Sequence, residues 1–72
     1  MRVGILGGGQ LGRMLALAGF PLDIRCQVFD PAQDACAGQV CKQHVADYDD
    51  MRSLFAFVQE CDVVTFEFEN IP

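Results

Sequence analysis

The chain opens with a short apolar segment that runs directly into a glycine-rich turn. Residues 2–6 (RVGIL) precede residues 7–12 (GGGQLG), which fit the spacing G-x-G-x-x-G. Glycines at this spacing permit a tight turn, a close approach of backbone N–H groups to a ligand, and close packing of a helix on a strand. The motif predicts a strand, a turn and a helix that can hold an anion or a sugar. Glycines that serve only the turn and the packing are the alternative.

Length and composition limit the chain to one small globular domain. It has 72 residues, of which 51% are hydrophobic and 21% charged. The net charge of −5 comes from ten acidic and five basic residues that are scattered singly, so no basic stripe predicts a nucleic-acid partner. No apolar run approaches the roughly 18 residues that cross a bilayer. We expect a soluble, cytoplasmic protein with no membrane or nucleic-acid partner.

The four cysteines do not form a recognisable metal or redox motif. They show neither C-x-x-C spacing nor neighbouring histidines, which argues against a zinc site and thioredoxin-like chemistry. Free thiols, buried or half-buried, are predicted at all four positions: Cys26, Cys36, Cys41 and Cys61.

Two amphipathic helices are predicted from apolar spacing at i, i+3, i+4 and i+7. The first covers residues 9–19 and stops at Gly19, before Pro21. Its apolar side is expected to pack on the sheet and consists of Leu11, Met14, Leu15 and Ala18. The second helix is expected to start at Asp47 or Asp49. Its apolar side consists of Met51, Leu54, Phe55 and Val58, widened by Phe57.

Apolar and β-branched segments predict four strands, at residues 2–6, 24–30, 43–46 and 61–68. Residues 34–40 are expected to form a short helix or an irregular connection. Alternation of strands and helices predicts an α/β fold with a parallel sheet, and right-handed crossovers favour the strand order 3-2-1-4. This is half of a doubly wound, Rossmann-like fold, with a ligand crevice between the first and fourth strands.

Candidate ligand contacts gather at the start of the first helix. Gly8 and Gly9 leave room for a ligand, and Gln10 and Leu11 offer a side-chain amide and a free backbone N–H. Gly12 is expected to serve close packing of the helix on the strand. The nearby Arg13 either pairs with a carboxylate or lies in solvent.

Several acidic residues are expected at strand ends. Asp30 follows Gly12 by 18 positions, where dinucleotide enzymes place an acid for the ribose 2′-OH; a turn carboxylate before Pro31 is the alternative. Glu67 and Glu69 lie on one side of the fourth strand, where two carboxylates repel unless a cationic or hydroxyl-rich group meets them. Solvated charges are the alternative.

Three segments together resemble one enzyme family. They are residues 7–14 (GGGQLGRM), 29–31 (FDP) and 62–72 (DVVTFEFENIP). This combination is similar to the N-terminal, pre-ATP-grasp domain of the N5-carboxyaminoimidazole ribonucleotide synthases of the ATP-grasp superfamily, also called phosphoribosylaminoimidazole carboxylase ATPase subunits. The resemblance covers almost the whole chain, and residues 1–72 are expected to form this domain.

The resemblance implies an ATP-dependent carboxylation in purine synthesis. Bicarbonate would be activated as carboxyphosphate and its carbon transferred to the amino group of 5-aminoimidazole ribonucleotide. It further implies that Gln10 and Leu11 contact this ribonucleotide, that Glu67 accepts hydrogen bonds from its sugar or amino group, and that ATP and Mg²⁺ bind in later domains. We therefore expect a 72-residue fragment that binds neither cofactor and is inactive alone. Its open last strand is expected to pair with another chain, as in a homodimer, or with residual partner domains.

Two other functions remain open from the residues alone. The glycine motif and Asp30 also fit the N-terminal half of an NAD(P)-dependent oxidoreductase. The acidic residues Glu67 and Glu69 argue against it, because their charge would lie near a pyrophosphate. A non-catalytic nucleotide-sensing or interaction module is the third possibility, and only the short length favours it.

Overall fold

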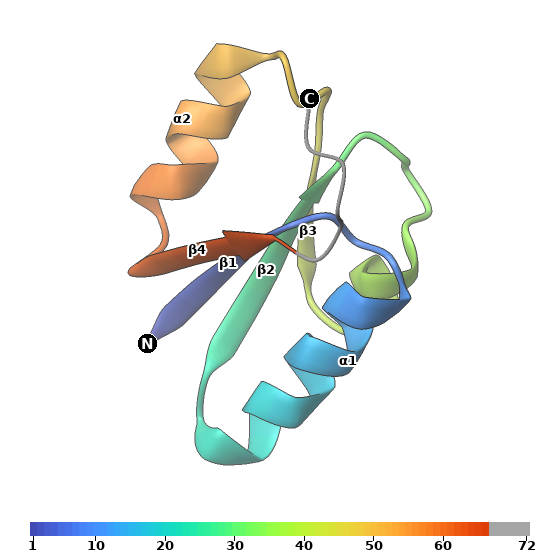
Figure 1. Cartoon of the computed structure of the whole chain (residues 1–72), viewed down its shortest axis with the longest axis vertical. Coiled ribbons are helices and arrows are strands. Elements are labelled where there is room, and N and C mark those ends of the chain that lie inside the picture. Colours follow the sequence, from blue (N-terminus) through green and yellow to red (C-terminus); the bar gives the residue numbers. More distant parts are fainter. Residues whose placement is uncertain (67–72) are drawn as a thin grey trace.

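Four parallel strands form a single sheet in the order β3-β2-β1-β4 (Figure 1). The computed structural model describes residues 1–66. The strands are β1 (Arg2–Leu6), β2 (Arg25–Asp30), β3 (Lys42–Val45) and β4 (Val63–Phe66). The helices are α1 (Gln10–Gly19) and α2 (Met51–Gln59), with the 3-10 helices η1 (Phe20–Leu22) and η2 (Cys36–Gln39). The α/β class, the half doubly wound fold and the strand order 3-2-1-4 predicted from the sequence are confirmed.

The predicted bounds of the first helix and of the first three strands are confirmed to within one residue, and the start of the fourth strand to within two. The second strand starts at Arg25 because the preceding residue closes the turn after η1: the Ile24 N–H donates to the Gly19 carbonyl at 3.1 Å. The third strand starts and ends one residue earlier than expected. Residues 34–40 contain the short helix η2. The predicted end of the fourth strand, at residues 67 and 68, lies outside the described residues.

Helix α1 packs on the sheet through small residues, so the predicted apolar side is wrong. Its buried residues are Gly12, Ala16 and Gly19, which follow one another at i, i+4 and i+7. The large residues expected there are exposed: Leu11 by 56% and Met14 by 57%. Small side chains let the helix backbone lie close to the sheet, and larger side chains cannot fit between them. The burial of Gly12 agrees with the packing role expected for it.

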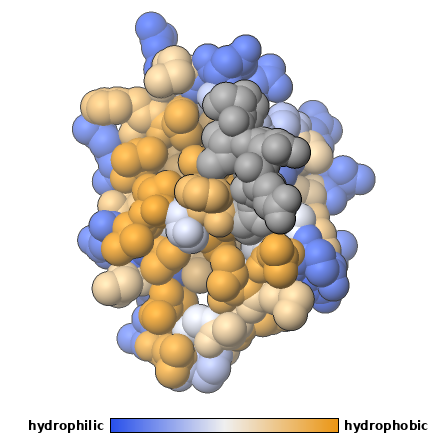
Figure 2. Space-filling view, in the orientation of Figure 1, coloured by the Kyte–Doolittle hydropathy of each residue, from blue (hydrophilic) through white to orange (hydrophobic). Residues whose placement is uncertain are grey.

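The large side chains of α1 therefore contribute to an apolar surface. Figure 2 shows this surface extending over β4, α1 and η1. A shallow apolar groove of about 260 Å³ lies between Leu15 and Leu22 on the helical side and Val3, Ile5 and Thr65 on the sheet. Isolated exposed apolar residues are normal, but a contiguous apolar surface on a small domain is typical of an interaction face.

Helix α2 covers the opposite side of the sheet and has a single buried anchor. Phe57 is fully buried, and its ring lies 5.4 Å from that of Phe29 and 5.0 Å from that of His44, centroid to centroid. Met51 and Phe55, expected to face the sheet, are 68% and 64% exposed. The predicted apolar side of this helix is therefore only partly right: Phe57, which widened it, is buried and Leu54 is half-buried, whereas Met51, Phe55 and Val58 are exposed.

The start of α2 also differs from the prediction. Asp50, rather than Asp47 or Asp49, is the N-cap residue. Its carboxylate accepts hydrogen bonds from the Ser53 backbone N–H at 3.2 Å and the Ser53 hydroxyl at 2.8 Å. These bonds satisfy an amide of the first helical turn that has no partner within the helix.

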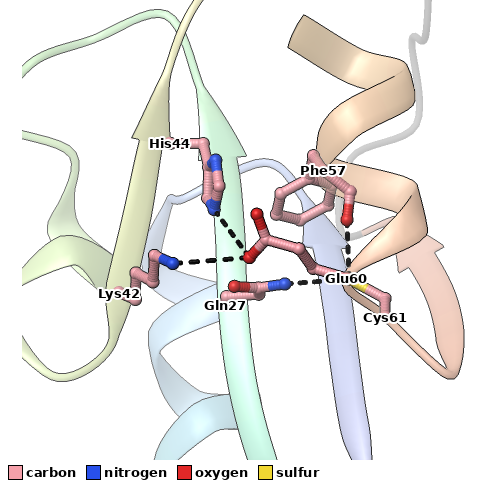
Figure 3. A network of polar contacts seen from close by, with 6 residues as sticks. All are labelled: Gln27, Lys42, His44, Phe57, Glu60 and Cys61. Atoms are coloured by element: carbon pink, nitrogen blue, oxygen red, sulfur yellow. Dashed lines mark hydrogen bonds and ion pairs between the residues drawn. The ribbon is translucent and has the colours of Figure 1, made fainter.

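A polar network connects the end of α2 to the sheet (Figure 3). The Gln27 amide donates to the Cys61 thiol at 3.1 Å, and this thiol donates to the Phe57 carbonyl at 3.2 Å. The Glu60 carboxylate lies 3.3 Å from the Lys42 ammonium and 3.7 Å from His44 Nε2. His44 thus has a packing role beside Phe57.

The core on the α1 side of the sheet is formed by Ile5, Val28 and Ala37, with Cys26 and Cys41 packed against them. All four cysteines are free and half-buried, as predicted. Burial raises the pKa of the Cys41 thiol, and the neighbouring Cys26 raises it further. Of the helices within residues 1–66, none has the length and apolar character that a membrane crossing requires.

Candidate functional site at the glycine turn

The turn after β1 depends on a backbone conformation that favours glycine. Gly7 has a φ of 111°, which side-chain-bearing residues rarely adopt. Its N–H donates to the Phe29 carbonyl at 2.8 Å, which continues the pairing of β1 with β2 by one residue. The chain therefore leaves the sheet sharply at its carboxyl edge, where ligands bind in open α/β folds.

Gly8 is held from two sides by the protein itself. Its N–H donates to Asp30 Oδ2 at 2.8 Å, and its carbonyl accepts from the Ala37 N–H at 2.7 Å. A Cβ atom at this position would lie 2.9 Å from the Ala35 Cβ. The amide of Gly8 is already engaged, so this residue shapes the turn and brings η2 against it.

Asp30 stabilises this turn through its carboxylate. While Oδ2 binds Gly8, Oδ1 accepts from the Ala32 N–H at 2.9 Å. Both carboxylate oxygens therefore bind backbone amides, which is the turn role considered as the alternative for this residue. The structure thus gives Asp30 a role in the turn that needs no ligand.

The amino end of α1 carries backbone amides that the helix itself does not satisfy. Gly9 is the N-cap residue and, as a glycine, has no side chain to cap the first turn. Gln10 and Leu11 follow it and are exposed. The first amides of a helix lack partners within it, and the helix dipole adds partial positive charge at this end. The first turn carries no acidic side chain, so it suits an oxygen acceptor or an anion.

A thiol links two side chains of this turn, and sequence reasoning missed it. Cys36, in η2, donates to the Gln10 side-chain oxygen at 3.2 Å. The Arg13 guanidinium donates to the same sulfur at 3.8 Å. Arg13 thus binds a thiol, neither of the two arrangements expected for it. Nothing in the sequence around Cys36 signals this contact, because it depends on how η2 packs on α1.

Strand β4 ends beside the glycine turn. Leu6, the last residue of β1, is the register partner of Phe66, the last of β4. The acidic residues Glu67 and Glu69, proposed to line the same crevice, lie outside the described residues. The register nevertheless places the described end of β4 next to the residue that precedes the turn.

Residues 1–66 do not provide a metal centre. No group of three or more His, Cys, Asp or Glu side chains in this range could hold a metal ion. The donor set that Mg²⁺ prefers, several oxygen ligands at near-octahedral positions, does not fit the described residues.

Comparison with known proteins assigns the chain to a family. All 72 residues match the family model described as the ribonucleotide synthetase preATP-grasp domain. The chain belongs to this family. An N5-carboxyaminoimidazole ribonucleotide synthase from Pseudomonas aeruginosa is 53% identical over 72 residues, which is 100% of this chain and 20% of that protein.

Solved structures show the same preATP-grasp fold. N5-carboxyaminoimidazole ribonucleotide synthetase from Thermus thermophilus superimposes with a TM-score of 0.93 at 53% identity, over 97% of this chain and 19% of that one. The Staphylococcus aureus N5-carboxyaminoimidazole synthetase complexed with ADP gives 0.91 at 42% identity, over 97% and 19%. The chain thus spans about a fifth of the length of these relatives. The oxidoreductase alternative is not favoured, since these relatives are ribonucleotide synthases.

Proposed function

We propose that this preATP-grasp domain is the N-terminal part of an ATP-dependent ligase of purine biosynthesis. The ligase carboxylates the amino group of 5-aminoimidazole ribonucleotide with bicarbonate, giving N5-carboxyaminoimidazole ribonucleotide, ADP and phosphate. The observation that carries this proposal is the 53% identity to an N5-carboxyaminoimidazole ribonucleotide synthase over the whole chain.

Within that ligase the domain forms one face of the ribonucleotide pocket. Gln10 and Leu11 donate hydrogen bonds to the ligand from the first turn of α1, while Gly8 and Gly9 let it approach the backbone. The exposure of Gln10 and Leu11 and their position in the first turn of α1, which carries no acidic side chain, support these roles.

Glu67 accepts hydrogen bonds from the sugar or the amino group in the same pocket. The pairing of Leu6 with Phe66 supports this role, because Phe66 is the covalent neighbour of Glu67. A carboxylate there would face donors of the ligand, and the helix start would face its acceptors.

ATP and Mg²⁺ bind outside this domain in the proposal, in the remaining four-fifths of the full-length relatives' length. The 72-residue chain alone is then inactive and holds neither group. A cytoplasmic location and a homodimeric assembly of the full-length ligase belong to the same proposal.

A chimaeric enzyme tests the proposal. The segment of the Pseudomonas aeruginosa synthase that matches this chain is replaced by residues 1–72, and ATP consumption is measured with aminoimidazole ribonucleotide and bicarbonate. We expect ribonucleotide-dependent ATP hydrolysis and formation of the carboxylated product. In this chimaera Gln10→Ala should raise the KM for the ribonucleotide by about 3- to 30-fold and leave the KM for ATP unchanged.

A folded chimaera that hydrolyses ATP without the ribonucleotide, or not at all, would contradict the proposed function. As a matched control, Gln59→Ala changes the same residue type at the exposed end of α2, away from the turn. Its kinetic constants should equal those of the parent chimaera.

A further inference from the structure

We infer that Cys36 is a positioning residue for the ribonucleotide site, an inference that rests on the proposed function. Its thiol fixes the Gln10 side-chain amide so that the NH₂ group, rather than the oxygen, is presented to the ligand. The ligand atom recognised by Gln10 is therefore a hydrogen-bond acceptor, such as an oxygen of a phosphate or sugar.

The direction of the hydrogen-bond chain determines this orientation. A guanidinium can only donate, so the sulfur of Cys36 accepts from Arg13 (Nη1 to Sγ, 3.8 Å). The single thiol hydrogen is then directed to an acceptor, which is Gln10 Oε1 at 3.2 Å. With its oxygen engaged, the Gln10 amide keeps both Nε2 hydrogens without a partner among residues 1–66.

The thiol itself is held in place by the backbone. Cys36 begins η2, and the next residue, Ala37, is fully buried and donates its N–H to the Gly8 carbonyl at 2.7 Å. The segment before η2 is in contact range of Gly8 through Ala35. η2 also packs along α1, which carries both Gln10 and Arg13. The thiol can therefore orient the amide with little loss of its own conformational freedom.

The donors at this end of α1 reinforce one another. Gln10 is the first residue of α1, so its Nε2 hydrogens lie at the amino end of the helix. The first backbone amides of the helix and its dipole also favour a hydrogen-bond acceptor there. An amide turned the other way would offer an acceptor beside those donors. The contact with Cys36 thus selects ligands that place an oxygen at the helix start.

The test uses the chimaeric synthase with the variants Cys36→Ala, Cys36→Ser, Gln10→Ala and the double variant Cys36→Ala/Gln10→Ala. Cys36→Ala should raise the KM for aminoimidazole ribonucleotide about 2- to 10-fold, with kcat and the KM for ATP unchanged. Cys36→Ser keeps a donor and should recover most of the loss. In the Gln10→Ala background, Cys36→Ala should add nothing, because both changes remove the same interaction.

Gln10→Glu gives a second readout. The carboxylate cannot donate and is negatively charged, so it should raise the ribonucleotide KM more than Gln10→Ala does. Cys41→Ala is the matched control: this half-buried thiol donates to the Ala37 carbonyl at 3.4 Å and does not bind Gln10. Its KM values should equal those of the parent.

The outcomes separate this inference from the proposed function. If Gln10→Ala leaves the ribonucleotide KM unchanged, the proposed site is wrong. The positioning role is wrong if Gln10→Ala raises the ribonucleotide KM and Cys36→Ala leaves it unchanged. It is also wrong if the rise in KM of the double variant is the product of the rises in the two single variants. If Cys36→Ala destabilises the protein, the serine variant decides: a ribonucleotide KM as high as that of Gln10→Ala, in a folded protein, contradicts the role.

Discussion

At the scale of single residues, Gly8 carries a specific steric requirement. A Cβ at this position would meet the Ala35 Cβ at 2.9 Å and the Asp30 Cβ at 3.3 Å, both atoms fixed to the backbone. Gly8→Ala should therefore lower the free energy of unfolding by about 1–3 kcal/mol, as overpacking does. Urea unfolding followed by circular dichroism measures this change.

The double variant Gly8→Ala/Ala35→Gly controls for the cause. It removes the nearer of the two opposing atoms, so it should recover part of the lost stability beyond the sum of the single changes. Strict additivity, or a Gly8→Ala chain as stable as the parent, would show that the turn is looser than the structure indicates.

Asp50 gives a prediction on pH dependence. Its hydrogen bonds from the Ser53 hydroxyl and then the Ser53 N–H lower the pKa of the carboxyl from its ordinary value of 3.8. A lowered folded-state pKa means that this contribution to stability is complete above the unfolded-state pKa and is lost as the pH falls through the folded-state value. The parent chain should lose helix stability below about pH 4 more steeply than Asp50→Asn, whose amide caps without titrating.

Unfolding midpoints between about pH 2 and pH 6, compared for the parent, Asp50→Asn and Asp50→Ala, measure this difference. Asp50→Ala should be less stable than both near neutral pH. Parallel curves for the parent and Asp50→Asn at the acidic end of this range would mean that the carboxylate does not cap α2.

At the scale of elements, apolar periodicity predicted where the helices lie but not which side faces the sheet. In α1 the buried positions are Gly12, Ala16 and Gly19, which a hydrophobicity pattern scores as weak. In α2 the anchor is Phe57, while Met51 is 68% exposed. A hydrophobicity pattern cannot distinguish residues that pack within a domain from residues that form a surface for contact with another domain, because both are apolar.

The packing of α1 through small residues predicts different stabilities for two neighbouring substitutions. Ala16 is 7% exposed and lies between helix and sheet, so Ala16→Leu should destabilise the chain by about 1–3 kcal/mol. The adjacent Leu17 is 51% exposed, and Leu17→Ala should change stability by less than about 0.5 kcal/mol. Thermal or urea unfolding of both variants checks the pair, and the reverse ranking would mean that the helix packs through its large residues.

At the scale of the whole molecule, strand order and the position of the glycine turn followed from local rules. Right-handed crossovers and a turn after the first strand are enough to predict the order β3-β2-β1-β4. The contacts within the site could not be predicted from these rules. Asp30 binds Gly8, and Cys36 binds Gln10, because β2 and η2 happen to meet the turn in space. Such contacts join residues more than twenty positions apart, and no spacing in the sequence reveals them.

The edge of the sheet yields a prediction on assembly. In the described sheet β4 has β1 on one side only, and its residues Val63 and Phe66 are 47% and 57% exposed. Unpaired strand edges with apolar side chains associate. The 72-residue chain should therefore self-associate at high micromolar concentration, with the mass measured by sedimentation.

Two variants test which surface makes the contact. Val63→Lys/Phe66→Lys, on the edge strand, should shift the chain to the monomer. Leu22→Lys, which changes the 70% exposed Leu22 of η1, should leave the self-association unchanged. If only Leu22→Lys gives the monomer, the chains meet through the apolar surface of α1 and η1, and the edge strand is not the contact.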